Sequence, residues 1–186
     1  MPNFWIVGGP NGSGKTTFAN EFLAPKMEVI SPDSISYNQY VNNVQAGRLA
    51  IKRQEELLYS MTDFAIDTTF SGNREISLLK LAIELGYNVH LVFICLDNTD
   101  LCRERINNRV KLGGHDVPQE DVVRRFQRSI DNLLKSYHIP QEVNVFDNSN
   151  SERKLILSIS NNNILFSDDN INDWAIPLFK NLKIKF

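Results

Sequence analysis

The sequence predicts an α/β fold in which a five-stranded parallel sheet is covered by helices on both faces. Three observations support this prediction. Short apolar runs alternate along the chain with segments of helical periodicity. The first apolar run leads directly into a glycine-rich stretch, which is followed by a helical segment. Polar residues also follow the predicted strands, where parallel sheets bind their ligands.

The five predicted strands are short apolar runs that end in turn residues. They cover residues 4–7, 27–30, 64–66, 89–96 and 143–146. The helices follow from apolar residues at helical spacing and from breakers such as Pro25 and Gly86. We predict helices over residues 15–23, 34–46, 48–60, 78–85, 99–111 and 122–134. Because strands and helices alternate, we expect the strands to lie parallel.

The C-terminal segment has a different pattern. Apolar runs at residues 155–157 and 164–166 flank three asparagines at 161–163. Such runs around a short polar turn predict a β-hairpin. We expect a short helix near Trp174 to follow it.

The length and composition of the chain indicate one globular domain. With 186 residues the chain is long enough for one well-cored domain and too short for two ordinary ones. We therefore predict a single domain over residues 1–186, with a core over 1–150 and a C-terminal appendage over 151–186. The chain has neither an apolar run of about 18 residues nor the features of a signal peptide. Its two cysteines, Cys95 and Cys102, have no metal-binding spacing. We therefore expect a cytoplasmic protein that does not bind membranes.

The charge of the chain is unevenly distributed. The formal net charge is −2, yet residues 103–128 contain seven of the twenty Lys and Arg residues and carry a charge of +3. The rest of the chain therefore carries −5. Proteins that coat nucleic acid are normally strongly basic, so this balance argues against nucleic acid as a partner. The basic segment indicates instead one anionic ligand held at one place.

Residues 9–16 match the phosphate-binding pattern G-x-x-x-x-G-K-[ST] between a predicted strand and a predicted helix. The glycines let backbone N–H groups point at phosphate oxygens, and the helix N-terminus adds its dipole. We expect Lys15 to reach the β- and γ-phosphates of ATP and the Thr16 hydroxyl to bind Mg²⁺. The candidate cofactor-binding residues are Gly9, Pro10, Asn11, Gly12, Ser13, Gly14, Lys15, Thr16 and Thr17. A chance match is possible, but the position directly after the first strand argues against it.

Carboxylates follow three of the predicted strands. Asp33 is a candidate general base that binds the acceptor and takes the proton of its hydroxyl, although it could also cap the next helix. Asp67 is a candidate Mg²⁺ ligand through water, or an acceptor-binding residue together with Thr68; a capped turn before Gly72 is the alternative. Asp97 has the apolar context of a Mg²⁺-binding aspartate, but we favour a helix cap there.

Arginines are concentrated on two predicted helices. Arg105 and Arg109 are four residues apart and therefore share one helix face, ahead of a glycine pair. The next helix carries Arg124, Arg125 and Arg128. Arginines stabilise the charge of a phosphoryl group in transfer, and a glycine hinge lets them close over ATP. Arg105 and Arg109 are therefore catalytic candidates and Arg125 is a substrate-binding candidate; a solvated basic surface is the alternative.

These motifs together resemble the zeta-toxin-like P-loop kinases, and more narrowly the bacterial branch also described as predicted ABC-type ATPases. The resemblance covers about residues 4–149. It rests on the glycine-rich motif at 9–17, Asp33 after the second strand, Asp67-Thr-Thr-Phe-Ser-Gly and the segment from Arg109 to Pro118. The chain contains no Leu-Ser-Gly-Gly-Gln-like signature that would support the ABC label.

The resemblance implies a core similar to nucleoside monophosphate kinases and an enzyme that uses ATP and Mg²⁺. Zeta toxins phosphorylate a UDP-activated N-acetylhexosamine, and an antitoxin blocks their nucleotide site. Carried over residue by residue, the resemblance matches Lys15 and Thr16 to the Walker residues, Asp33 to the base, and Arg105 and Arg109 to the lid arginines. Asp67 stands where this branch usually shows glutamate.

The sequence thus predicts a phosphotransferase that moves the γ-phosphoryl group of ATP to a hydroxyl of a small-molecule acceptor. A nucleotide-sugar acceptor, a toxic role and an antitoxin partner are the finer expectations. Two alternatives remain open. A nucleoside or nucleic-acid kinase would share the same site, whereas an ATP-binding regulator acting through a partner would not need Asp33. We also expect Asn148 and Ser149, after the fifth strand, to lie near the adenine.

Overall fold

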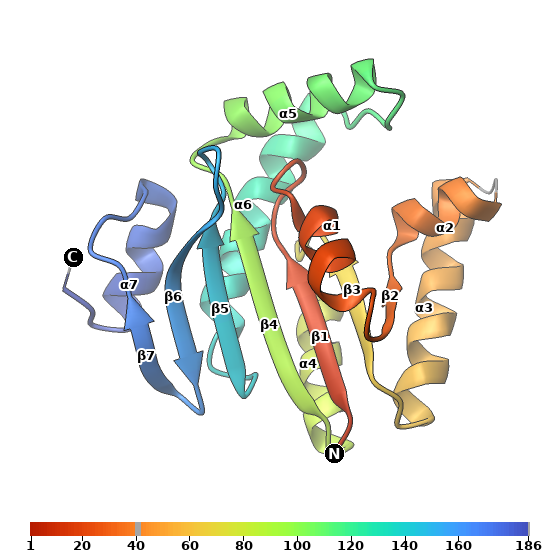
Figure 1. The fold of residues 1–186 in the computed structure, drawn as a ribbon, viewed down its shortest axis with the longest axis horizontal. Coiled ribbons are helices and arrows are strands. Elements are labelled where there is room, and N and C mark those ends of the chain that lie inside the picture. Colours follow the sequence, from red (N-terminus) through yellow and green to blue (C-terminus); the bar gives the residue numbers. More distant parts are fainter. Residues whose placement is uncertain (40–41, 186) are drawn as a thin grey trace.

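The computed structural model describes residues 1–39 and 42–185 of the chain. Its strands are β1 (Asn3–Gly8), β2 (Glu28–Ile30), β3 (Phe64–Thr68), β4 (Asn88–Cys95), β5 (Glu142–Asp147), β6 (Lys154–Ser160) and β7 (Asn163–Ser167). They form one sheet in the order β2-β3-β1-β4-β5-β6-β7 (Figure 1). The first five strands pair in parallel, whereas β6 and β7 are antiparallel. The predicted five-stranded parallel sheet is therefore confirmed.

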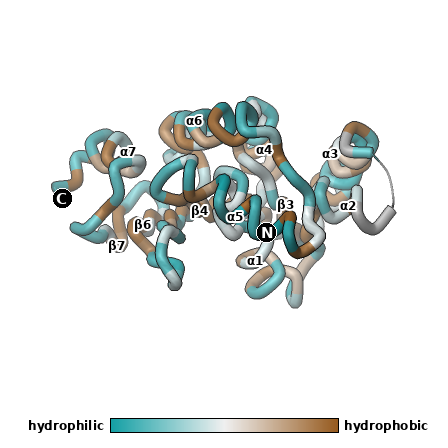
Figure 2. The backbone as a smooth tube through the Cα atoms, turned by 90° about the horizontal axis from the view of Figure 1, so that it is seen from above, coloured by the Kyte–Doolittle hydropathy of each residue, from teal (hydrophilic) through white to brown (hydrophobic). Residues whose placement is uncertain are grey.

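The helices are α1 (Lys15–Phe18), a π-helical turn (Ala19–Leu23), α2 (Pro32–Gln39), α3 (Asn43–Tyr59), α4 (Asn73–Glu84), α5 (Thr99–Lys111), α6 (Gln119–Ser136), a 3₁₀ turn (Asp173–Ala175) and α7 (Ile176–Asn181). Seen from above, α4, α6 and α7 lie on one side of the sheet and α1 on the other, as predicted (Figure 2). Helix α5 crosses over the carboxyl ends of the strands (Figure 1). None of the helices in the described part of the chain has both the length and the apolar character that a membrane span requires.

The two faces of the sheet pack into cores of different size. The larger core, on the side of α4 and α6, includes Phe4 and Phe64, whose stacked rings have centroids 4.6 Å apart. The Tyr87 hydroxyl, also on this side, donates to the Leu57 and Leu58 carbonyls and so ties the end of α3 to the start of β4. The smaller core packs the π-helical turn against the other face. Burial on both faces explains why β1, β3 and β4 appear in the sequence as continuous apolar runs.

The predicted helix break at Gly47 is wrong. Helix α3 begins at Asn43 and continues through Gly47, because the Asn42 side chain accepts a hydrogen bond from Gln45 N and caps the helix there. Burial of Ala46 and Ala50 helps to offset the cost of about 1 kcal/mol for glycine inside a helix. The predicted helix over 34–46 also includes residues 40–41, which lie outside the described residues.

The predicted C-terminal hairpin is present and extends the main sheet. Strand β6 pairs with β5, and β7 lies at the far edge. Trp174, Leu178 and Phe179, from the segment after β7, are buried in the larger core. The sequence analysis did not predict where the hairpin would lie, because its pairing partner is set by tertiary packing.

The topology brings the carboxyl ends of β1, β2 and β3 to one edge of the sheet. Strand β1 lies between β3 and β4, and Gly8 at its end is in register with Thr68 of β3. The segment that follows β1 therefore emerges beside the polar end of β3. The connection after β1 runs to one face of the sheet and the connection after β3 runs to the other. Open α/β sheets bind their ligands where neighbouring connections separate in this way.

Candidate functional site

Residues 9–14 form a tight loop between β1 and α1, as the motif predicts. Gly9 and Gly14 have φ angles of 140° and 92°, in the left-handed region. A Cβ atom at Gly9 would lie 2.0 Å from the Ile94 carbonyl oxygen, so only glycine fits there. The loop therefore passes directly over the end of β4. Lys15 begins α1, whose N-terminus faces the loop interior.

Lys15 is held inside this loop. Its side chain is buried, and its Nζ donates to the Pro10 carbonyl at 2.8 Å. Burial lowers the pKa of Lys15, while the nearby charges of Asp67 and Asp33 raise it. A buried ammonium group with one neutral partner is poorly compensated. A phosphate oxygen at this position would supply the missing negative charge.

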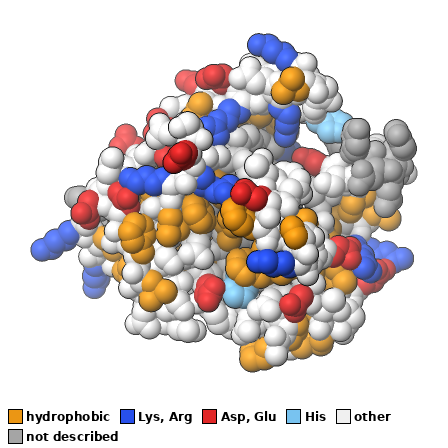
Figure 3. Space-filling model, viewed as in Figure 1, with side chains coloured by type: hydrophobic (Ala, Val, Ile, Leu, Met, Phe, Trp, Pro, Cys, Tyr) orange, Lys and Arg blue, Asp and Glu red, His pale blue; other side chains and the backbone are white. Residues whose placement is uncertain are grey.

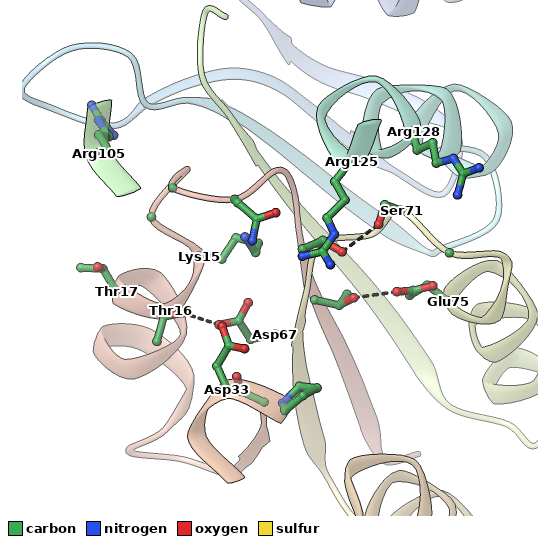
Figure 4. A pocket seen from close by; sticks show the side chains of 18 of the residues that line it. Lys15, Thr16, Thr17, Asp33, Asp67, Ser71, Glu75, Arg105, Arg125 and Arg128 are labelled. Carbon is green, nitrogen blue, oxygen red and sulfur yellow. Dashed lines mark hydrogen bonds between the residues drawn. The ribbon is translucent and has the colours of Figure 1, made fainter. Parts of the chain in front are cut away.

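Thr16 and Asp67 form the second polar pair of the site. The Thr16 hydroxyl donates to Asp67 Oδ2 at 2.5 Å (Figure 4). Burial raises the pKa of Asp67, although Lys15 and the Thr16 hydrogen bond act in the opposite direction. Among the described residues, no group of three or more His, Cys, Asp or Glu is arranged to hold a metal ion. Two oxygen-bearing side chains still suit Mg²⁺, which keeps several waters and takes other ligands from phosphates.

A cavity of about 700 Å³ opens in front of these residues. It is lined by most of the predicted site residues, namely Asn11, Gly12, Gly14, Lys15, Thr16, Thr17, Asp33, Asp67, Thr68, Arg105, Arg109 and Arg125. The predicted loop residues Gly9, Pro10 and Ser13 do not line it. Arg124, Arg128 and Glu75 also face this cavity. Its wall is thus rich in cations, which suits a polyanionic ligand.

Asp33 is the second residue of α2 and is exposed at the cavity. In Figure 4 its side chain lies next to Asp67 and Thr16. A carboxylate in the first turn also interacts favourably with the helix dipole. Asp33 thus faces the cavity from the first turn of α2, and it can stabilise that helix as well.

The arginines of α5 approach the loop from the opposite side. Arg105 Nη2 lies 3.4 Å from the Ser149 and Asn150 carbonyls, and Arg109 Nη2 donates to the His115 carbonyl at 2.7 Å. Asn148 Nδ2 donates to the Ser13 carbonyl, so the segment after β5 contacts the phosphate loop. The expected place of Asn148 and Ser149 near the adenine stays a prediction.

The turn between β3 and α4 closes the cavity on the side away from α1. Thr68 Oγ1 donates to Glu75 Oε1 at 2.6 Å and accepts from Phe70 N. Phe70 is buried with a φ of 54°, and Asn132 Nδ2 from α6 donates to the carbonyls of Phe70 and Gly72. The sequence analysis missed Glu75 and Asn132. Asn132 could have been noticed because it is a polar residue on the apolar face of α6.

The predicted helix cap at Asp97 is wrong. Asn98 caps α5, since its Oδ1 accepts from Leu101 N. Asp97 accepts instead from the side chains of Asn98 and Asn172 on the molecular surface. Asp97 lies two positions before Thr99, the first residue of α5, so its side chain is too far from the free N–H groups of the first turn. Both cysteines are buried and free.

Comparisons with known proteins identify a family and a relative of this chain. Residues 4–133 match the model of a family described as AAA domain (AAA_33). A Haemophilus influenzae protein described as uncharacterized is 33% identical over 123 residues, which make up 63% of this chain and 88% of that protein.

Two solved structures share the fold. The crystal structure of AvrRxo1-ORF1:-ORF2 with ATP matches with a TM-score of 0.71 and 17% identity, over 99% of this chain and 64% of that chain. This chain thus spans less than two thirds of that protein. The PezAT chromosomal toxin-antitoxin system of Streptococcus pneumoniae matches with a TM-score of 0.62 and 17% identity, over 97% and 78% of the two chains. The fold is therefore the α/β fold of P-loop kinases. Since the family match covers more than half of the chain, including the phosphate loop and Asp67, the protein belongs to the AAA domain family.

Proposed function

We propose that this protein transfers the γ-phosphoryl group of ATP to a hydroxyl group of a small-molecule acceptor. One observation carries the proposal: the exposed carboxylate of Asp33 lines the same cavity as Lys15 and the Thr16–Asp67 pair. A protein that only binds or slowly hydrolyses ATP does not need a carboxylate at the acceptor side of the phosphates. The cation-rich wall of the cavity also supports a reaction in which negative charge shifts between oxygens.

In this proposal the residues divide into three roles. Lys15 and the backbone of residues 9–14 hold the phosphates of ATP. Asp33 orients the acceptor hydroxyl and accepts its proton as the hydroxyl oxygen bonds to the γ-phosphorus. The bond between that phosphorus and the β–γ bridging oxygen breaks, and ADP leaves. Arg105, Arg109 and Arg125 neutralise the charge that spreads over the transferring group.

Thr16 and Asp67 would hold Mg²⁺, with Asp67 acting through a bound water. When bound, the ion would neutralise negative charge on the phosphates of ATP. The protein's own contribution is the Thr16–Asp67 hydrogen bond, which orients the hydroxyl before any ligand arrives. Burial raises the pKa of Asp67, and a cation bound beside this carboxylate would favour its charged form.

The finer form of the proposal is a toxin that acts on a nucleotide sugar in the cytoplasm and is restrained by an antitoxin. It is supported by the resemblance to zeta toxins and by the match to the PezAT system. An antitoxin that covers the cavity would block both the phosphate loop and Asp33. The match to AvrRxo1-ORF1:-ORF2, solved as a complex with ATP, is consistent with a partner chain.

A transfer assay tests the proposal. Purified protein is incubated with γ-labelled ATP, Mg²⁺ and a panel of UDP-sugars, nucleosides and short RNA. We expect label to appear on one acceptor class. Transfer should be lost in Asp33→Asn. The matched control is Asp97→Asn, which changes a surface carboxylate outside the cavity and should leave transfer unchanged. Release of free phosphate alone, with every acceptor unlabelled, would contradict the proposal and favour a regulatory ATPase.

A further inference from the structure

A second, smaller cavity of about 170 Å³ lies between α3 and α4. It shares four lining residues with the large cavity, namely Pro32, Asp67, Thr68 and Glu75. The two cavities therefore meet at the end of β3, on the side of the site where Asp33 and the turn after β3 lie. A ligand that places a hydroxyl at Asp33 in the large cavity can therefore extend into the small cavity.

The walls of the small cavity are mainly apolar. Ala50 and Ile51 come from α3, Ile66 from β3 and Leu78 from α4. Ile66 and Leu78 also belong to the larger hydrophobic core, so this wall is rigidly packed. Such a surface favours a group with apolar faces over a strongly hydrated one.

The charged groups of the small cavity are the guanidinium of Arg74 and the carboxylates of Asp67 and Glu75, and each carboxylate accepts a hydrogen bond from a threonine hydroxyl. Arg74 Nη2 lies 3.4 Å from Gln54 Oε1 and 3.6 Å from Glu55 Oε1, so a carboxylate balances the guanidinium. Gln54 is 8% exposed, and its amide has both a donor and an acceptor. Glu75 is held by Thr68 at 2.6 Å. The two carboxylates disfavour an anion, whereas the amide of Gln54 and the guanidinium of Arg74 offer hydrogen bonds to an uncharged edge.

Gly47 supplies the remaining space. It lies inside α3, where glycine costs about 1 kcal/mol relative to alanine. Gly47 lines the small cavity, and a Cβ atom built on it meets nothing within 4 Å. Neither a turn nor a close backbone contact requires glycine at this position. The missing side chain therefore widens the cavity.

We propose that the small cavity is the acceptor subsite and takes a compact, uncharged ring with apolar faces and one hydrogen-bonding edge. This ring is the part of the acceptor remote from the hydroxyl that is phosphorylated. The inference deepens the proposed function and rests on it for the identity of the ligand as an acceptor. Gly47 and Gln54 are the residues that determine which ring is accepted.

The test begins with binding, so that it does not depend on catalysis. Saturation-transfer NMR measures the binding of 2-pyridone, with myo-inositol as a polyol and benzoate as a charged comparison. We expect the full chain to bind 2-pyridone, Gly47→Leu to reduce that binding at least tenfold, and Arg48→Leu to leave it unchanged. Arg48 is the exposed neighbour on the same helix, so both variants add the same side chain to α3. Absence of 2-pyridone binding, or binding that Gly47→Leu leaves intact, would overturn the proposed subsite.

Kinetics then connect the subsite to the reaction. With the acceptor found in the transfer assay, Gly47→Leu should raise the acceptor KM at least tenfold and leave the ATP KM within twofold. An unchanged acceptor KM would show that the ring lies elsewhere, even though the protein is a kinase. If no acceptor is labelled by the wild-type protein, the proposed function fails, and the NMR result alone decides whether the small cavity binds rings of this class.

Discussion

Replacing Asn132 by leucine is predicted to lower the free energy of unfolding by about 2–4 kcal/mol. Asn132 is 4% exposed, and its Nδ2 donates to the Phe70 carbonyl at 3.0 Å and the Gly72 carbonyl at 2.8 Å. Leucine has a similar volume but no donor, so two carbonyl oxygens lose their partner. A lost hydrogen bond that leaves such a group unsatisfied costs about 1–2 kcal/mol, and two give the predicted range.

The same substitution is expected to affect the site. Phe70 is held with a φ of 54°, a conformation that costs a non-glycine residue roughly 1–2 kcal/mol. Without the amide of Asn132, the turn can relax away from this strained conformation. Thr69 and Ser71 from this turn line the large cavity. Phosphoryl transfer should therefore slow, while ATP binding stays within about twofold because the phosphate loop is untouched.

Urea unfolding at pH 7, followed by the fluorescence of the two tryptophans, measures the stability change. Gln127→Leu is the matched control, because Gln127 lies on the same helix but is exposed. Its effect should stay within about 0.5 kcal/mol. A loss of less than 0.5 kcal/mol for Asn132→Leu would refute the role assigned to its two hydrogen bonds.

Three further predictions concern the phosphate loop and its partners. Lys15→Met should weaken ATP binding by at least about 100-fold in calorimetry without lowering the melting temperature, because a poorly compensated buried charge is removed. Burial raises the pKa of Asp67 above its ordinary value of 3.8, so the folded protein binds the proton more tightly and loses stability as pH rises through that raised pKa. Asp67→Asn should therefore reduce the stability loss between pH 4 and pH 7, and an unchanged pH profile would contradict this. Gly9→Ala should lower the free energy of unfolding by about 2 kcal/mol or more, since its Cβ would lie 2.0 Å from the Ile94 carbonyl oxygen. Gly47→Ala should leave the free energy of unfolding unchanged or raise it, and thermal unfolding measures both variants.

Much of the fold follows from local sequence patterns. The predicted helix over 99–111 has the observed bounds of α5, and the five predicted strands lie within about two residues of the observed ones. These elements combine strong periodicity with clear breakers, so local preference and tertiary packing agree. The phosphate loop was also predictable, because the motif requires specific residue types at fixed positions.

One error was local: Gly47 suggested a helix break, but Asn42 caps α3 at its start and the helix runs through Gly47. The other features that the sequence analysis missed depend on contacts distant in sequence. The hairpin was recognised, yet nothing local shows that β6 pairs with β5. Likewise, the bonds from Asn132 to the turn after β3 span about sixty residues, and residues from four elements line the small cavity.

The central claim is that Asp33 serves as the base of a phosphoryl transfer. The most direct measurement is single-turnover transfer from γ-labelled ATP to the identified acceptor by Asp33→Asn, with ATP affinity measured on the same preparation. We predict that the transfer rate falls by about 10²–10⁴-fold while ATP affinity stays within about threefold. Transfer at the wild-type rate in Asp33→Asn would contradict the account.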